Sequence, residues 1–77
     1  MTNLEIAMET VNINTEFIKL DALLKYAALV SSGGEAKRVI AEGLVFVNGE
    51  SCPMRGKKIR PGDRVVFGER EILIGQA

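Results

Sequence analysis

The sequence contains no histidine and only one cysteine, Cys52. A single thiol cannot form a disulfide within its own chain, and zinc sites are built from several cysteine and histidine ligands. Cys52 precedes Pro53 in a segment expected to be a loop, where an unreactive thiol is the simplest interpretation. We therefore predict no disulfide, no metal site and no cofactor.

Long apolar runs are also missing. No stretch approaches the roughly 20 residues that span a bilayer. The opening residues, MTNLEIAMETVNIN, lack the basic start and continuous apolar block of a secretory signal. A chain of 77 residues that is 47% hydrophobic can form one small core. We therefore expect a cytoplasmic monomer with a single domain over residues 11–77 and a frayed tail over residues 1–10.

Aromatic residues are scarce, namely Phe17, Tyr26, Phe46 and Phe67. The phenylalanines lie in apolar contexts, so we expect them in the core. Proteins that bind single-stranded nucleic acid stack bases on exposed aromatic rings. Such a stacking platform is therefore not predicted for this chain.

The charges cancel, with ten basic and ten acidic side chains, but they are distributed unevenly. Residues 1–16 carry three glutamates and no cation, whereas residues 17–60 carry eight cations and four acids. The middle of the chain is therefore net positive. A local positive field attracts phosphate whatever the net charge is.

Two short helices are predicted between residues 20 and 42. The first, over about 20–29, has apolar residues at helical spacing: Leu20, Leu23, Leu24, Ala27 and Ala28. The second, over about 33–42, follows Ser32, whose hydroxyl should accept from the Glu35 amide while the Glu35 carboxylate returns to the Ser32 amide. Gly43 suits the left-handed residue that ends a helix. A linker of three or four residues would make the pair a helical hairpin.

The apolar period changes to two outside the helices. Residues 10–14 alternate apolar and polar positions, which indicates a half-buried strand. Residues 44–50 read as a strand running into Asn48-Gly49, a dipeptide that favours a tight hairpin turn. A turn at 60–63 and a hairpin of 64–67 with 70–74 follow. The fold class is therefore α+β, with two short helices packed on a small, mostly antiparallel sheet.

The segment SSGGEAKR, residues 31–38, has the glycines and cations of a phosphate-binding loop. A nucleotide-hydrolysing loop needs GxxxxGK followed by serine or threonine, and here Glu35 follows the glycines and Arg38 follows Lys37. Glu35 and Glu42 lie two turns apart without a catalytic partner, so an enzyme is not predicted. Anion binding by the free amides at the helix start and a simple capped helix both remain open for this segment.

A second basic segment, PMRGKKIRPG at residues 53–62, favours anion binding over a simple capped helix. It carries Arg55, Lys57, Lys58 and Arg60 without an intervening acid. A solvated loop is the alternative interpretation, but two basic elements bordering one groove are stronger evidence for a nucleic-acid site than either alone. Because few aromatic rings are available for stacking, recognition of phosphates and shape favours structured RNA.

The stretches FIKLDALLKYAALVSSGGEAKRVIAEGLVFVNGE and KKIRPGDRVVF together resemble the S-four RNA-binding domain, named for ribosomal small-subunit protein four. The resemblance covers nearly all of residues 17–67. It extends to small stand-alone bacterial members, the YaaA/YbcJ-like group, in the SGG-AK pattern and in the Arg-Gly-basic-Lys cluster at 55–58. The matching residues are Leu20-Asp21, Leu24, Ser32, Ala36, Ile40, Gly43, Val45, Val47-Asn48-Gly49 and Pro61-Gly62-Asp63.

The resemblance implies an αL motif, in which two helices and the following hairpin present a basic surface to RNA. Larger members commonly have arginine where Lys19 stands and a Ser-Arg pair where this chain has Ser32-Gly33, so glycine amides are expected to supply part of that contact. We expect a non-catalytic module that holds structured RNA, with ribosomal RNA or a ribosomal subunit as partner. The expected RNA-binding residues are Lys19, Ser32, Lys37, Arg38, Arg55, Lys57 and Lys58 by position in the family, with Gly33, Gly34 and Arg60 added from the residues themselves.

Two alternatives stay open. VNGE followed by PGDRV is similar to the sheet of ubiquitin-like (β-grasp) sulfur carriers. Those carriers end in Gly-Gly, whereas this sequence ends in IGQA, and two helices are predicted here where a carrier has strands. A protein-interaction module is the second alternative.

Overall fold

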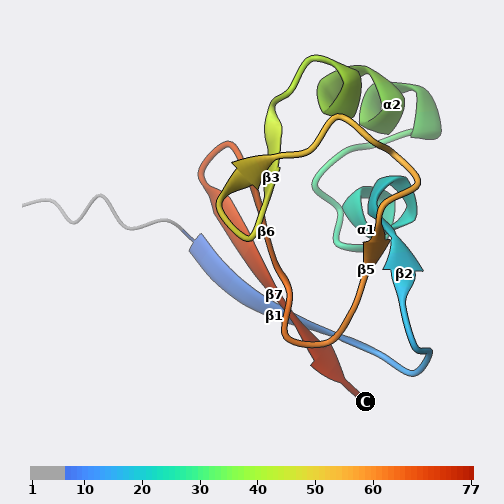
Figure 1. The fold of residues 1–77 in the computed structure, drawn as a ribbon, viewed down its shortest axis with the longest axis vertical. Coiled ribbons are helices and arrows are strands. Elements are labelled where there is room, and N and C mark those ends of the chain that lie inside the picture. The colour runs from blue at the N-terminus through green and yellow to red at the C-terminus, as the bar shows by residue number, and fades with distance from the viewer. Residues whose placement is uncertain (1–6) are drawn as a thin grey trace, which may run out of the picture.

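The computed structural model describes residues 7–77, which form two sheets and two helices (Figure 1). The larger sheet has five strands in the order β1-β7-β6-β3-β4, and β2 and β5 form a separate two-stranded ladder. Only β1 and β7 pair in parallel, which confirms the predicted α+β class with a mostly antiparallel sheet. In chain order the elements are β1 (Ala7–Ile13), β2 (Ile18–Lys19), α1 (Leu20–Tyr26), α2 (Gly33–Ala41), β3 (Val45–Val47), β4 (Glu50–Ser51), β5 (Lys58–Ile59), β6 (Arg64–Phe67) and β7 (Arg70–Gln76).

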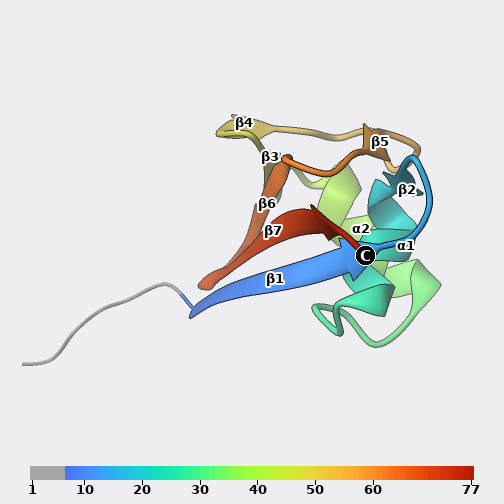
Figure 2. The same ribbon diagram turned by 90° about the horizontal axis from the view of Figure 1, so that it is seen from below.

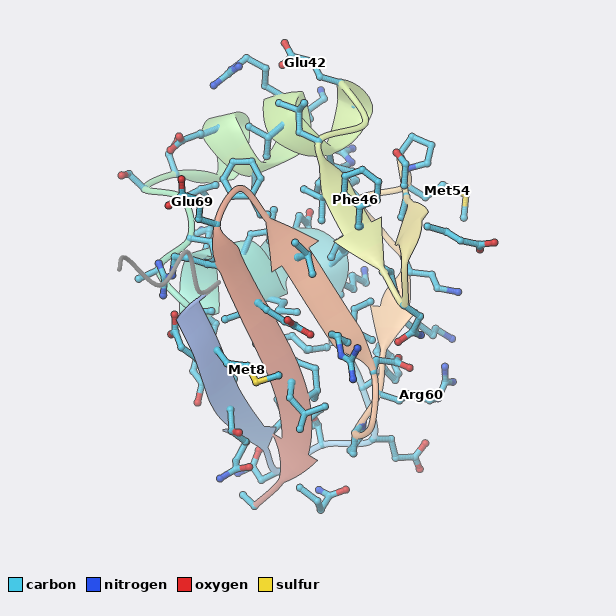
Figure 3. All side chains as sticks on the ribbon, turned by 90° about the vertical axis from the view of Figure 1, so that its left-hand side faces the viewer. Met8, Glu42, Phe46, Met54, Arg60 and Glu69 are labelled. Carbon is cyan, nitrogen blue, oxygen red and sulfur yellow. The ribbon has the colours of Figure 1, made fainter. Side chains whose placement is uncertain are left out.

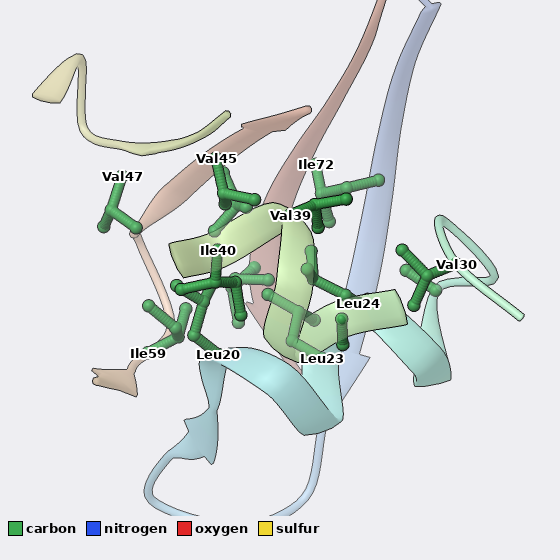
Figure 4. Close-up of a cluster of buried hydrophobic side chains, with 14 of the residues drawn as sticks. Leu20, Leu23, Leu24, Val30, Val39, Ile40, Val45, Val47, Ile59 and Ile72 are labelled. Atoms are coloured by element: carbon green, nitrogen blue, oxygen red, sulfur yellow. The ribbon is translucent and has the colours of Figure 1, made fainter. Parts of the chain in front are cut away.

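Both helices lie on one side of the five-stranded sheet, whose other face is turned toward the viewer in Figure 3 (compare Figure 2). The apolar stripes predicted for the helices meet the inward side chains of the strands (Figure 4). Full burial of each such side chain stabilises the fold by about 1.5–3 kcal/mol. The buried residues include Leu20, Leu23, Leu24, Ala36, Val39 and Ile40 from the helices and Ile13, Val45, Ile59, Val65, Ile72 and Ile74 from the strands.

Helix α1 ends at Tyr26, three residues before the predicted end. Ala28, expected on the buried face, is exposed and has a left-handed φ of 58°. The Arg70 guanidinium donates hydrogen bonds to the carbonyls of Ala27 and Ala28, at 3.2 and 3.0 Å. These bonds satisfy carbonyls that lack partners where a helix ends. The connection to α2 therefore takes the six residues 27–32, longer than the linker of three or four that was expected.

The first strand begins earlier than the alternation at residues 10–14 indicates. β1 starts at Ala7 and pairs in parallel with β7, with Val11 opposite Ile74. Residues 7–10 of the expected tail therefore belong to the sheet, and residues 1–6 lie outside the described part of the chain. The alternation in the sequence indicated a strand, but it could not show which strand would pair with it.

The predicted turns are confirmed. Asn48 and Gly49 have φ values of 52° and 90°, as a two-residue hairpin turn requires, and Gly62 in the 60–63 turn has φ of 97°. The Asn48 amide also joins the two turns, because it donates to Asp63 at 3.1 Å and accepts from the Arg64 N–H at 3.0 Å. The β2-β5 ladder between these turns and the helices was not predicted.

Candidate nucleic-acid interface

The β2-β5 ladder places two lysines directly opposite each other. β2 and β5 are antiparallel, with Ile18 opposite Ile59 and Lys19 opposite Lys58. The isoleucine pair turns toward the core, and both lysines are exposed. Like charges at directly opposed positions destabilise a sheet. This pair therefore reduces stability unless an anion lies between or above the two ammonium groups.

The basic loop is fixed beside these lysines by the start of α1. The Leu20 N–H donates to the Lys57 carbonyl at 2.9 Å, and the Asp21 N–H donates to the Arg55 carbonyl at 3.1 Å. Lys19, the residue at the N-terminal cap, offers no side-chain bond to the helix. Loop carbonyls thus satisfy amides that a helix start would otherwise leave without partners. As a result, the side chains of Arg55 and Lys57 project from a loop tied to the end of β2.

Phe17 completes this group and corrects the expectation that it belongs to the core. Its ring is half-buried, and Lys58 Nζ lies 4.9 Å and Arg60 Cζ 5.9 Å from the ring centroid. Cations at such distances are attracted to an aromatic face. Phe17 therefore positions two of the cations, a role that the sequence analysis missed. Phe67 is also only half-buried, and Phe46 is 40% exposed on the outer face of the sheet (Figure 3).

These contacts bring five of the ten predicted RNA-binding residues together. We call this group the cationic patch: Lys19, Arg55, Lys57, Lys58 and Arg60. Among residues 7–77, the ion pairs use Arg38, Arg64 and Arg70, and none uses a residue of the patch. The patch thus retains its positive charge on the folded surface.

The start of α2 holds the other five predicted residues. Ser32 Oγ accepts from the Glu35 N–H at 3.1 Å, as predicted, but the Glu35 carboxylate accepts from the Ser31 N–H at 2.9 Å, one residue before the amide expected. A side chain at Gly33 would meet nothing within 4 Å. Packing therefore does not require this glycine, which is exposed at the start of the helix.

Lys37 and Arg38 differ in what they offer. Lys37 is exposed and is in no ion pair of the described residues, whereas Arg38 Nη1 lies 3.4 Å from Glu42 Oε1. At least half of each side chain in that pair is exposed, so the pair contributes little stability. No hydrogen bond or ion pair within residues 7–77 joins this part of α2 to the cationic patch. In Figure 1, α1 lies between α2 and the ladder. The predicted single groove with two walls therefore stays a prediction.

Replacement of Ser32 by alanine distinguishes a cap from an RNA contact. Loss of the Glu35 N–H bond should lower the free energy of unfolding by about 1 kcal/mol. Thermal unfolding of Ser32→Ala beside the unmodified protein measures this. An unchanged melting temperature with weakened RNA binding would instead identify Ser32 as a ligand contact.

The described residues offer little support for a metal site, a reactive cysteine or a membrane-spanning helix. Residues 7–77 contain no group of three or more histidine, cysteine, aspartate or glutamate side chains placed to hold a metal ion. Cys52 is half-buried, with its sulfur 3.8 Å from the Met54 carbonyl oxygen. Within the same residues, neither helix has the length and apolar character needed to cross a bilayer.

Comparison with known proteins identifies relatives over most of the chain. A family model described as S4 domain matches residues 11–75. The probable ribosome maturation protein RlbA of Bacillus subtilis is 44% identical over 66 residues, which cover 82% of this chain and 93% of that protein.

Small ribosomal subunit protein uS4 gives weaker matches over 52 residues. The identity is 29% for Sphingopyxis alaskensis and 31% for Novosphingobium aromaticivorans. Each match covers 68% of this chain but only 26% of the uS4 protein. Two helices in series precede β3, where a sulfur carrier was expected to have strands, so the element order does not support the carrier alternative. The chain belongs to the S4 domain family.

Proposed function

We propose that this chain binds structured RNA, with ribosomal RNA as its partner, through phosphate contacts from the cationic patch. The opposed Lys19 and Lys58 carry the proposal, because their repulsion is relieved when a phosphate binds between them. The relatives, a probable ribosome maturation protein and a small ribosomal subunit protein, support a ribosomal partner.

The start of α2 would supply a second contact in this proposal. The amides of Gly33 and Gly34, which bond to no other group among residues 7–77, and the partial positive charge of the helix start suit a phosphate group, and Lys37 lies exposed on the same helix. Glu35 opposes this contact with a negative charge in the first turn. We therefore assign the larger share of affinity to the cationic patch and a smaller share to Ser32, Gly33, Gly34, Lys37 and Arg38.

The dependence of RNA affinity on salt tests this mechanism. Each neutralised phosphate releases condensed counterions, so the logarithm of affinity falls linearly with the logarithm of salt concentration. If four to six cations engage phosphates, the slope should be about −3 to −5. Titration of a structured ribosomal RNA fragment at several potassium chloride concentrations measures the slope. An affinity that does not change with salt would exclude the patch as the main binding surface.

Crosslinking in cells separates this function from a protein-interaction module. The protein is crosslinked, purified under denaturing conditions, and the attached RNA is sequenced. We expect ribosomal RNA fragments enriched over a Lys57→Glu, Lys58→Glu variant expressed at the same level. Recovery of proteins alone, with no RNA above that control, would favour the interaction module.

A further inference from the structure

A cavity of about 290 Å³ lies between the end of β1, the segment that leads to β2, and α1. Ile13 and Ile18 supply apolar surface to its wall, and Asn12, Asn14, Thr15 and Tyr26 supply polar groups. Pockets that enclose drug-sized ligands measure roughly 300–1,000 Å³. The size of this cavity therefore suits a single flat ring system.

Tyr26 gives the cavity an aromatic wall. It is the last residue of α1 and is 64% exposed, so its ring contributes little to the core. Its hydroxyl has no hydrogen-bond partner within residues 7–77. Exposed aromatic rings of this kind stack with unpaired bases. The scarcity of aromatic residues thus does not exclude stacking, because one ring is placed at a cavity.

The cavity also presents side-chain amides without internal partners. No hydrogen bond among the described residues uses the side-chain amide of Asn12 or Asn14. Each amide offers donors and an acceptor, the groups that bind the edges of bases. Asn12 lies opposite Gly75 in the β1-β7 register, and a side-chain carbon at Gly75 would collide with Asn12 Oδ1. Glycine at this position leaves room for the Asn12 amide.

The cavity and the cationic patch share strand β2. Ile18 lines the cavity, whereas the next residue, Lys19, belongs to the patch and points to the opposite face of the strand, because successive side chains alternate. RNA that contacts both surfaces therefore uses different nucleotides for the phosphate contacts and for the cavity.

We infer that this cavity binds one unpaired nucleobase of the RNA that the cationic patch holds. Tyr26 stacks on the base, and Asn12 and Asn14 bond to its edge. The inference rests on the proposed function, and it assigns base recognition to a surface distinct from the phosphate contacts.

Tyr26 is the only tyrosine in a chain without tryptophan, so its fluorescence reports on this cavity alone. The probes are RNA hairpins with a single-stranded loop of one nucleotide type and a matched hairpin whose loop lacks bases. We expect at least one loop to quench the tyrosine emission and to bind about tenfold more tightly than the abasic hairpin. Tyr26→Ala should remove this difference and leave affinity for the abasic hairpin unchanged, while Tyr26→Phe should preserve it.

The outcomes separate the two proposals. Equal affinity for the base-containing and abasic hairpins, with unchanged tyrosine emission, would overturn the base site while the phosphate-binding function stands. Failure of every hairpin to bind would overturn both. Tyr26→Ala and Asn14→Ala alter exposed side chains, so the fold should survive, and unfolding curves check this.

Discussion

Reversal of the charges of Lys57 and Lys58 to glutamate should weaken RNA binding about 100-fold at low salt. Each substitution replaces attraction to phosphate by repulsion, and a unit charge pair at 4 Å is worth about 1 kcal/mol in water and more near a protein surface. Both side chains are exposed, so the fold should not depend on them. Binding isotherms on a structured RNA at two salt concentrations measure the loss, which should shrink as salt rises.

Two controls make this result specific. Lys25→Glu makes the same charge change as Lys58→Glu, but at an exposed position of α1 outside the patch. It should change affinity less than threefold, and it is compared with Lys58→Glu alone. Lys58→Glu should leave the stability of the free protein nearly unchanged, because the opposite charges across the ladder from Lys19 offset the lost attraction of Lys58 to the Phe17 ring. An equal loss of RNA affinity in Lys25→Glu and Lys58→Glu would indicate a general charge effect and contradict a defined patch.

Replacement of Arg70 by methionine should lower the free energy of unfolding by about 2–3 kcal/mol, the largest effect expected from any surface side chain here. The Arg70 guanidinium donates to both Glu9 carboxylate oxygens at 2.8 Å and to the carbonyls of Ala27 and Ala28. One side chain thus joins β1, β7 and the end of α1. Its removal leaves one carboxylate and two carbonyls without their partner. Urea unfolding monitored by circular dichroism measures the loss.

Arg64 provides the matched arginine for this experiment. It pairs with Glu71 at 2.8 Å, where the Arg64 side chain is 57% and the Glu71 side chain 14% exposed, and it makes no bond that joins helix to sheet. Arg64→Met should cost about 1 kcal/mol, less than Arg70→Met, because it leaves one mostly buried carboxylate and no carbonyl without a partner. Arg70→Lys should recover only part of the stability, because an ammonium group cannot reproduce the planar fork of donors. Equal losses for Arg64→Met and Arg70→Met would show that Arg70 does not fasten the helices to the sheet.

The Arg70 contacts also bear on the proposed base site. They bind the carbonyls of Ala27 and Ala28, directly after α1 ends at Tyr26, and Tyr26 lines the cavity. A helix continued to residue 29, as the apolar spacing predicts, would carry Ala28 toward the core and change the path into α2. Arg70→Met should therefore reduce the difference in affinity between base-containing and abasic hairpins before it reduces phosphate binding.

Features that depend on residues a few positions apart follow from the sequence alone. The apolar stripes of both helices apart from Ala28, the Ser32 cap and the turns at Asn48-Gly49 and 60–63 are confirmed, because helix and turn geometry is set within about four residues. Four of the five cations of the patch lie in one basic segment of the sequence, and the family resemblance added Lys19. That resemblance was sufficient to predict the S4 fold.

Which of these residues meet depends on how the strands pair. Lys19 lies opposite Lys58, and Glu9 binds Arg70, although the chain separates each pair widely. The alternation of a strand shows that one face is buried but does not name the neighbouring strand. The same reason explains why Phe17 was assigned to the core instead of the cationic patch and why the ladder was missed. Strand pairing gathered the patch, and a single arginine between sheet and helix binds the carbonyls that follow α1.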